Sequence, residues 1–329
     1  MRRILFFCLI LWTAHAAAQG GHYVISAKNA EPMASEDRLR AQVEFLSDTL
    51  CAGRQTGTEG STWAIAWIGN RMDAIGLDRP GDFRYHGFRT DNGKTAHNVA
   101  GLLPGRGGQN RKYVIVTAHF DHIGTLSGTL YPGADSNASG VAALLSLADM
   151  FQYMKELGRT WSRSSLFVAL DAKEQSLGGS LHLWDQIDDG LLVDPDTRLP
   201  ISRKDIELVV NIDQVGSTLS PLHPDRPDYL IMLSDERSGR REALSFINRS
   251  NSLFLDLGFS YYGSKDFTQL FYRRISDQKP FLDHGIPSVM FTSGITLNNN
   301  KPYDNAASLD YAVLRKRVLL MYYYLARIL

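Results

Sequence analysis

Short apolar runs, each bounded by turn-forming residues, recur along the chain and predict β-strands. They cover residues 97–105, 112–118, 165–170, 206–212, 228–233 and 287–292, which read HNVAGLLPG, KYVIVTA, SLFVAL, IELVVNI, DYLIML and PSVMFT. Several of these runs are continuously apolar or β-branched, as in central strands that are covered on both faces. We therefore expect them to form the buried middle of a sheet.

Other segments place apolar residues at the spacing of an α-helix. Helices are predicted over residues 37–50, 60–77, 137–157 and 308–329, with Gly76 as a stop signal and Ser308 as an N-cap. Alternating strands and helices are typical of an α/β layer fold with a mainly parallel sheet. No linker-like segment divides the chain, so we expect one domain of about 300 residues.

The charge balance narrows the classes of partner. The chain has 35 basic and 35 acidic side chains, so its formal net charge is zero. This balance argues against the broad basic surface of a nucleic-acid-binding protein. We therefore expect no nucleic acid among the partners.

The first residues, MRRILFFCLILWTAHAAAQG, have the pattern of a secretory signal peptide. Two arginines precede a short apolar core, and alanines follow it where a signal peptidase would cleave. We predict a signal peptide over residues 1–18, a mature domain over 19–329, and a periplasmic or extracellular location. The mature chain would keep one cysteine, Cys51, as a core thiol, and would have no membrane span.

Three of the predicted strands end in residues that could carry chemistry. The first is followed by His119 and Asp121, the second by Asp171 and Glu174, and the third by Asp213. In an open α/β sheet, ligands bind beyond the carboxyl ends of the strands. We therefore expect these side chains to face one crevice.

Histidine with carboxylates is a donor set that zinc accepts. A further acid, Asp135, lies in a glycine-containing loop before a predicted helix and could bridge two metal ions. Asp121 is placed to accept the second ring N–H of His119 and fix its tautomer. A strand-end acid can equally be a helix cap or a solvated charge, so the spacing alone leaves a metal site and structural roles open.

Five motifs in this order carry a family resemblance: VTAHFDHIG, GADSNASGVAALL, LDAKEQSLGGS, VVNIDQVG and SDQKPFLDHGIPSVMF. Together they resemble the zinc-dependent aminopeptidase family of bacterial secreted leucyl aminopeptidases and the related glutaminyl cyclases. The resemblance begins at VEFLSDTLCAGRQTGTEG and runs to YDNAASLDY, nearly the whole predicted mature chain. It implies a mixed sheet of about eight strands between helices.

The resemblance also implies roles for single residues. His119 and Asp213 would hold a first zinc, Asp135 would bridge both zincs, and Glu174 would hold the second. The sequence departs from the family at two positions. Lys173 stands where the family has the glutamate that acts as general base, and Asn300 stands where it has the last histidine ligand.

Two interpretations of Lys173 remain open. Its ammonium could occupy or neighbour the second-metal position and pair with Asp135 and Glu174, which leaves one zinc or none. Alternatively, the side chain could point to solvent while water acts as the missing ligand.

Other residues of the motifs have less defined roles. We expect a structural role for His284, whereas Asp277 matches a family position near the site without an assignable role. The aromatic residues Tyr261, Tyr262, Phe267 and Tyr272 could either favour apolar substrates or pack as ordinary core and surface residues.

Three functions follow as hypotheses. The first is a secreted aminopeptidase that removes N-terminal residues from peptides through a metal-bound water, with an altered metal site. The second is a catalytically silent family member that binds peptides or a partner protein. The third is an aminoacyl transferase of the glutaminyl cyclase type, which both departures disfavour.

Overall fold

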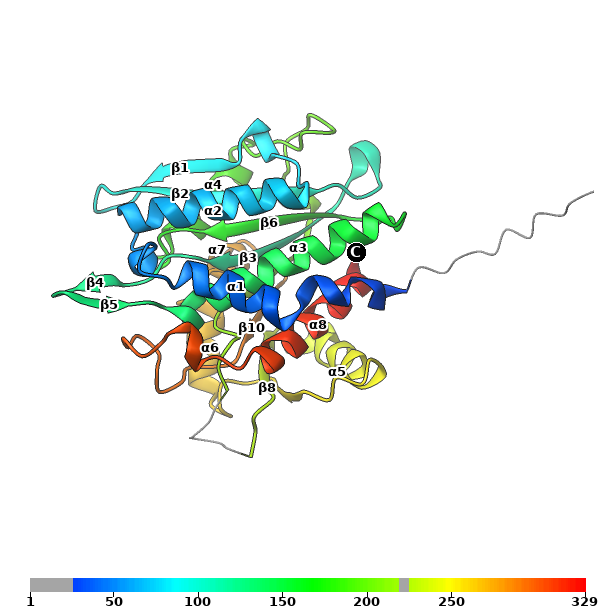
Figure 1. Cartoon of the computed structure of the whole chain (residues 1–329). Coiled ribbons are helices and arrows are strands. Elements are labelled where there is room, and N and C mark those ends of the chain that lie inside the picture. The colour runs from blue at the N-terminus through cyan, green and yellow to red at the C-terminus, as the bar shows by residue number, and fades with distance from the viewer. Residues whose placement is uncertain (1–25, 219–224) are drawn as a thin grey trace, which may run out of the picture.

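A mixed eight-stranded sheet forms the middle layer of the molecule (Figure 1). The computed structural model describes residues 26–218 and 225–329. The strands of this sheet, in chain order, are β1 Tyr85–Arg89, β2 Thr95–Leu103, β3 Tyr113–His119, β6 Ser164–Leu170, β7 Ile206–Ile212, β8 Tyr229–Ser234, β9 Asp256–Gly258 and β10 Ser288–Thr292. A separate hairpin, β4 Gly124–Leu126 with β5 Thr129–Tyr131, projects from one end of the sheet (Figure 1).

The spatial order of the strands is β1-β2-β6-β3-β7-β10-β8-β9. The central strands β6, β3, β7 and β10 run parallel to one another. Antiparallel pairs flank them, since β1 pairs with β2, β2 with β6, and β8 with β10. The predicted mixed, mainly parallel α/β sheet is therefore confirmed.

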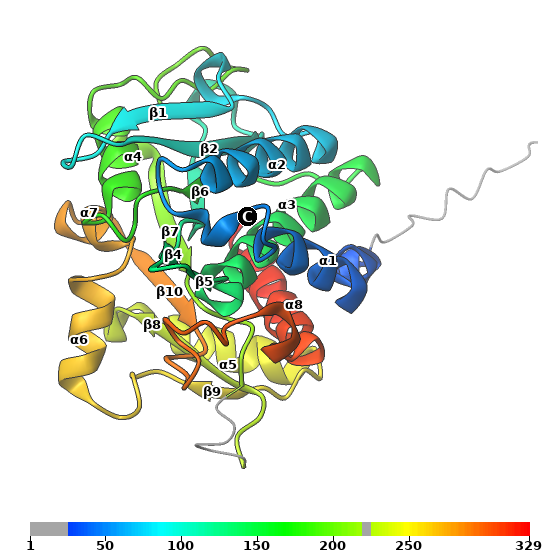
Figure 2. The same cartoon turned by 60° about the vertical axis from the view of Figure 1, so that its left-hand side comes forward.

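Helices cover both faces of the sheet. They are α1 Glu36–Leu46, α2 Glu59–Ile75, α3 Gly140–Glu156, α4 Gly178–Asp188, α5 Arg240–Ser250, α6 Lys265–Arg273, α7 Lys279–Asp283 and α8 Tyr311–Ile328. Figure 1 shows α1, α2, α3 and α8 in front of the sheet, and Figure 2 shows α4, α6 and α7 on its other side.

The central strands are buried on both faces because their side chains alternate between two hydrophobic layers. On β3, Val114 and Val116 pack in the layer that includes α3 and α8, whereas Tyr113 and Ile115 pack in the layer that includes α4. All seven residues of β3 are buried. This burial explains why the strand reads as a continuous apolar run rather than as an alternating one.

Helix ends partly follow the predicted signals. Gly76 ends α2 in the left-handed region, with φ of 85°, as predicted. The N-cap of α8 is Asp310, whose carboxylate accepts a hydrogen bond from Val313 N at 3.0 Å, so the prediction of Ser308 was wrong. Ser308 lies in a preceding 3-10 turn and donates to the Asn305 carbonyl. The helix therefore begins at Tyr311, two residues later than a Ser308 cap predicts.

The remaining predictions concern the cysteine, membrane-spanning helices and the signal peptide. Cys51 is a buried free thiol, as predicted. In the described part of the chain, no helix is long and apolar enough to cross a membrane. The predicted signal peptide over residues 1–18 lies outside the described residues and stays a prediction.

Candidate functional site

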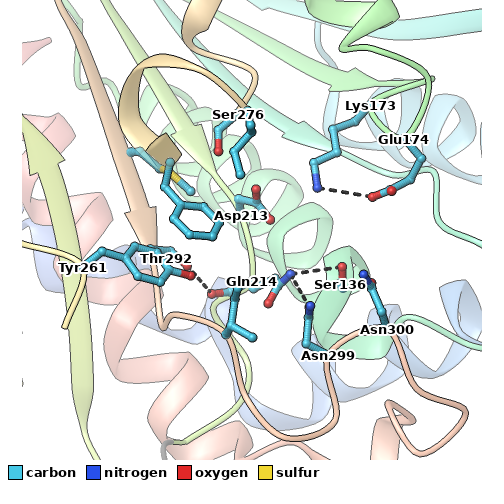
Figure 3. A pocket seen from close by; sticks show the side chains of 14 residues that line it. Ser136, Lys173, Glu174, Asp213, Gln214, Tyr261, Ser276, Thr292, Asn299 and Asn300 are labelled. Atoms are coloured by element: carbon cyan, nitrogen blue, oxygen red, sulfur yellow. Dashed lines mark hydrogen bonds and ion pairs between the residues drawn. The ribbon is translucent and has the colours of Figure 1, made fainter. Parts of the chain in front are cut away.

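The carboxyl ends of β6, β3 and β7 lie side by side because these strands are parallel neighbours. A pocket of about 220 Å³ opens beyond this edge (Figure 3). Its lining residues are Ser136, Lys173, Glu174, Asp213, Gln214, Tyr261, Phe271, Ile275, Ser276, Met290, Thr292, Ile295, Asn299 and Asn300. The sheet therefore brings three predicted positions, Lys173, Glu174 and Asp213, together with Asn300 in one cavity.

Lys173 reaches into this pocket. Figure 3 shows its ammonium between the carboxylates of Asp213 and Glu174, and Nζ lies 3.3 Å from Oε1 of Glu174. Burial lowers the pKa of the amine, but the carboxylates of Asp213, Glu174 and Asp277 outweigh it and hold this pKa above its usual value. The Lys173 side chain is 18% exposed, so it does not simply extend into solvent.

Asp135 does not join this group. Its Oδ1 accepts hydrogen bonds from the backbone N–H groups of Gly216 at 2.8 Å and Ser217 at 3.2 Å, and from Ser139 Oγ at 3.1 Å. Among the ion pairs of residues 26–218 and 225–329, none joins Lys173 to Asp135. The neighbouring side chain, Ser136, lines the pocket instead. Asp135 does not line the pocket, and its Oδ2 is buried without a hydrogen-bond partner, so its metal-bridging role stays a prediction.

His119 lies behind the pocket wall and is fully buried. Its Nε2 is 3.4 Å from Oδ1 of Asp213, and its Nδ1 is 3.1 Å from the Asp121 carbonyl oxygen and 3.6 Å from Oδ1 of Asp121. Burial and the Lys173 ammonium lower the pKa of His119, but Asp121 and Asp213 outweigh them and raise it to about 10. Lys173, followed by His119, overcomes the effect of burial on Asp213 and lowers the pKa of that carboxyl to about 2.

The Asp121 carboxylate mainly holds the turn that carries Lys173 and Glu174. Its two oxygens accept the backbone N–H groups of Lys173 and Glu174, each at 3.0 Å. The nearest contact of His119 is to the backbone carbonyl of Asp121 rather than to its carboxylate. Asp121 therefore fixes both neighbouring strand ends, and its contact with the imidazole is the longer one.

Asn137 and Asp304 are site residues that the sequence analysis missed. Asn137 Nδ2 donates to the carbonyls of His119 at 3.1 Å and Ile212 at 2.9 Å, so it ties the ends of β3 and β7 together. Asp304 accepts from the backbone N–H groups of Asp135 at 2.7 Å and Ser136 at 3.0 Å. The available signal was composition, since Asn and Asp in turn segments commonly bond backbone groups.

The lower rim of the pocket is made of neutral polar groups (Figure 3). Gln214 Nε2 donates to Ser136 Oγ at 3.2 Å and to Asn299 Oδ1 at 2.7 Å. Asn300 adds an amide beside them, with a backbone φ of 55°. The position that the resemblance assigns to a histidine ligand therefore holds an amide within a hydrogen-bonding rim.

The opposite wall is apolar, formed by Tyr261, Phe271, Ile275, Met290 and Ile295. Of the four aromatic residues considered from the sequence, Tyr261 is the one that lines the pocket. Tyr272 is buried, and its hydroxyl donates to the Ser288 carbonyl at 2.7 Å. The pocket thus combines a charged side with an apolar side.

Two further motif residues, Asp171 and His284, lie outside the pocket lining and make structural contacts. Asp171 accepts from Thr56 Oγ1 at 2.8 Å and His97 N at 3.1 Å, and burial together with Asp121 raises its pKa to about 7. His284 caps α7 and stacks on Trp184 with ring centroids 4.0 Å apart, which is the expected structural role.

Asp277 is buried beside the pocket, and neither carboxylate oxygen has a hydrogen-bond partner. Burial raises the pKa of Asp277 to about 6, although the nearby charges of His119 and Lys173 act in the opposite direction. It therefore adds to the negative potential around Lys173.

The donor groups do not fit the two-zinc centre that the resemblance implies. Within residues 26–218 and 225–329, no group of three or more histidine, cysteine or acidic side chains is arranged to hold a metal ion. Glu174 pairs with an ammonium, Asp135 does not line the pocket, and Asn300 supplies an amide. A metal would have to displace the Lys173 ammonium from the carboxylates that surround it.

Comparisons with known proteins place the chain in a family. The model of Peptidase family M28 matches residues 98–325. A zinc aminopeptidase from Bacillus subtilis has a similar structure, with a TM-score of 0.67 and 14% identity, over 90% of this chain and 95% of that chain. At this identity the likeness shows the fold alone.

Curated relatives match shorter segments. The BOS complex subunit NCLN of Homo sapiens is 32% identical over 133 residues, which are 40% of this chain and 22% of that protein. The alkaline phosphatase isozyme conversion protein of Escherichia coli is 26% identical over 215 residues, 61% of this chain and 57% of that protein. The chain thus matches about a fifth of the length of NCLN. Because the family model covers most of the chain, from within β2 to within α8, this protein belongs to Peptidase family M28.

Proposed function

We propose that this chain is a catalytically silent member of the family that binds the N-terminal ends of peptides, or of a partner protein, in the pocket beyond the sheet. One observation carries the proposal, namely that the Lys173 ammonium lies among the carboxylates of the pocket and pairs with Glu174 at 3.3 Å. An ammonium has three donors and no lone pair, so it cannot take a proton from water as a glutamate would.

The pocket has the features of a peptide-end site. Asp213 and Glu174 outnumber the single lysine among its lining residues, and this excess of negative charge favours a ligand ammonium. The wall from Tyr261 to Ile295 offers contact to an apolar side chain. Binding without cleavage needs only this complementarity, whereas hydrolysis also needs a base and an activated water.

A second candidate, hydrolysis at an altered zinc site, is favoured by His119, Glu174 and Asp213 lying at one sheet edge. We rank it below silent binding because these three groups do not converge on one point and Lys173 neutralises Glu174. Lys173 and Asn300, which replace the family's glutamate and histidine, also argue against glutaminyl cyclase chemistry.

The relatives and the N-terminus suggest a setting for this activity. NCLN is a subunit of a complex by its name, and this supports a partner protein as a ligand. The signal-like residues 1–18 support action outside the cytoplasm.

Turnover of leucyl anilide, with and without added zinc or cobalt, tests the proposal. We expect no metal-dependent turnover by the unaltered protein. Lys173→Glu combined with Asn300→His should also stay inactive, because Ser136 rather than Asp135 faces the pocket. Adding Ser136→Asp should raise the zinc content measured on the purified protein. Zinc-dependent turnover by the unaltered chain would contradict the proposal.

A further inference from the structure

A second cavity, of about 360 Å³, adjoins the pocket and shares Lys173 and Ile275 with it. We call it the vestibule. Its lining residues are Lys173, Ser176, Leu177, Leu181, Arg274, Ile275 and Lys279. Three of these side chains are cationic and none is acidic, so the vestibule differs in charge from the pocket beside it.

The three cations are compensated to different degrees. Lys173 pairs with Glu174 on the pocket side, and Lys279 pairs with Asp283 one helical turn further on. In the part of the chain that the structure describes, the Arg274 guanidinium forms no ion pair and no hydrogen bond. Only the backbone N–H of Arg274 is bonded, to the Leu270 carbonyl oxygen. Arg274 therefore has its planar set of five N–H donors available for a ligand carboxylate.

Apart from Ser176, the rest of the vestibule lining is apolar. Leu181 is 43% exposed and Ile275 is 41% exposed, so both present hydrocarbon surface at the cavity mouth. An apolar surround lowers the local dielectric and strengthens the attraction between a cation and an anion. It also offers contact to the methylene groups of a glutamate side chain.

The two cavities together impose an order on a bound peptide. With its terminal ammonium near Asp213 and its first side chain on the apolar wall, the peptide must leave the pocket through a neighbouring opening. An extended chain advances about 3.3–3.6 Å per residue, so the side chain that reaches an adjoining cavity belongs to the second or third residue.

We propose that the vestibule selects peptides that carry an acidic side chain at the second or third position, behind an apolar N-terminal residue. This inference rests on the proposed function, because it assumes that a peptide end occupies the pocket. It adds a specificity element, formed by Arg274 with Lys173 and Lys279, that favours a carboxylate and disfavours a lysine at these positions.

Fluorescence anisotropy on the mature protein tests this with labelled peptides that begin Leu-Glu-Glu, Leu-Gln-Gln or Leu-Lys-Lys and are otherwise identical. We expect the Glu peptide to bind about fivefold more tightly than the Gln peptide, which corresponds to about 1 kcal/mol. The Lys peptide should bind most weakly. The preference should shrink as salt rises, because the vestibule is open to solvent.

Arg274→Gln should reduce the preference of Glu over Gln to less than about twofold. Lys265→Gln is the matched control, since it removes one exposed charge from the start of α6, the helix that ends next to Arg274, and lies outside both cavities. Thermal unfolding of both variants checks that they remain folded.

The outcomes separate this inference from the proposed function. Equal binding of the Glu and Gln peptides, or a preference that Arg274→Gln leaves intact, overturns the vestibule assignment while the pocket remains a peptide site. Failure of all three peptides to bind contradicts the proposed function itself.

Discussion

Replacing Lys173 by methionine would remove the ammonium and keep most of the side-chain length. Glu174 would lose its ion pair, and the buried Asp213 would lose its largest favourable neighbour charge. The nearby carboxylate of Asp277 has no hydrogen-bond partner, so the repulsion within the cluster would rise. We therefore expect the variant to be less stable than the unaltered protein at neutral pH.

The magnitude lies between two limits. Removing one partner of a fully buried pair costs about 3–5 kcal/mol, whereas an exposed pair contributes about 0.2–1 kcal/mol. The Lys173 side chain is 18% exposed and that of Glu174 is 36% exposed, so the pair is intermediate. We expect a loss of about 1–2 kcal/mol in the free energy of unfolding.

Urea unfolding at pH 7, followed by circular dichroism, measures this loss. The control is Lys279→Met, which removes the same group from an ion pair whose side chains are 37% and 49% exposed. The control should cost about 0.5 kcal/mol or less. Adding Glu174→Gln to Lys173→Met should recover part of the stability, because it removes one of the uncompensated charges. A Lys173→Met variant as stable as the unaltered protein would refute the reasoning.

Two further predictions concern the frame of the site and its response to acid. Asn137→Ala should lower the free energy of unfolding by about 2–4 kcal/mol, because it leaves the buried His119 and Ile212 carbonyls without this donor; Asn305→Ala, which removes a surface cap, should cost about 1 kcal/mol in the same urea titration. Burial lowers the pKa of His86 from 6.5 to about 4. The contribution of the neutral His86 to the free energy of unfolding is therefore fully present above pH 6.5 and is lost on acidification towards pH 4. His86→Gln should therefore flatten this part of the stability profile, and an unchanged slope would contradict the assignment.

The sequence predicts the fold well because the central strands are buried on both faces. Such strands are continuous apolar runs, and their ends coincide with the first polar residues. His119 and Asp213 could therefore be placed at one sheet edge before the structure was known. The pair between Lys173 and Glu174 also follows from adjacency at a strand end.

The features of the site that the sequence did not predict depend on backbone direction and on contacts between residues far apart in the chain. Asp135 and Ser136 are adjacent in an irregular turn, and sequence pattern does not tell which side chain faces the cavity. The turn is held by Asp304, which lies 169 residues away from Asp135 in sequence. Local periodicity contains no information about such a contact, so the sequence pattern alone does not predict that Ser136 rather than Asp135 lines the pocket.

Recovery of a bound peptide tests the central claim most directly. The protein would be mixed with an equimolar Leu-Glu-Glu peptide and zinc, separated from free peptide, and the bound fraction analysed by mass spectrometry. The account predicts that the peptide is retained by the protein and recovered at its full length. Recovery of a peptide shortened by its N-terminal leucine would contradict a silent binding site.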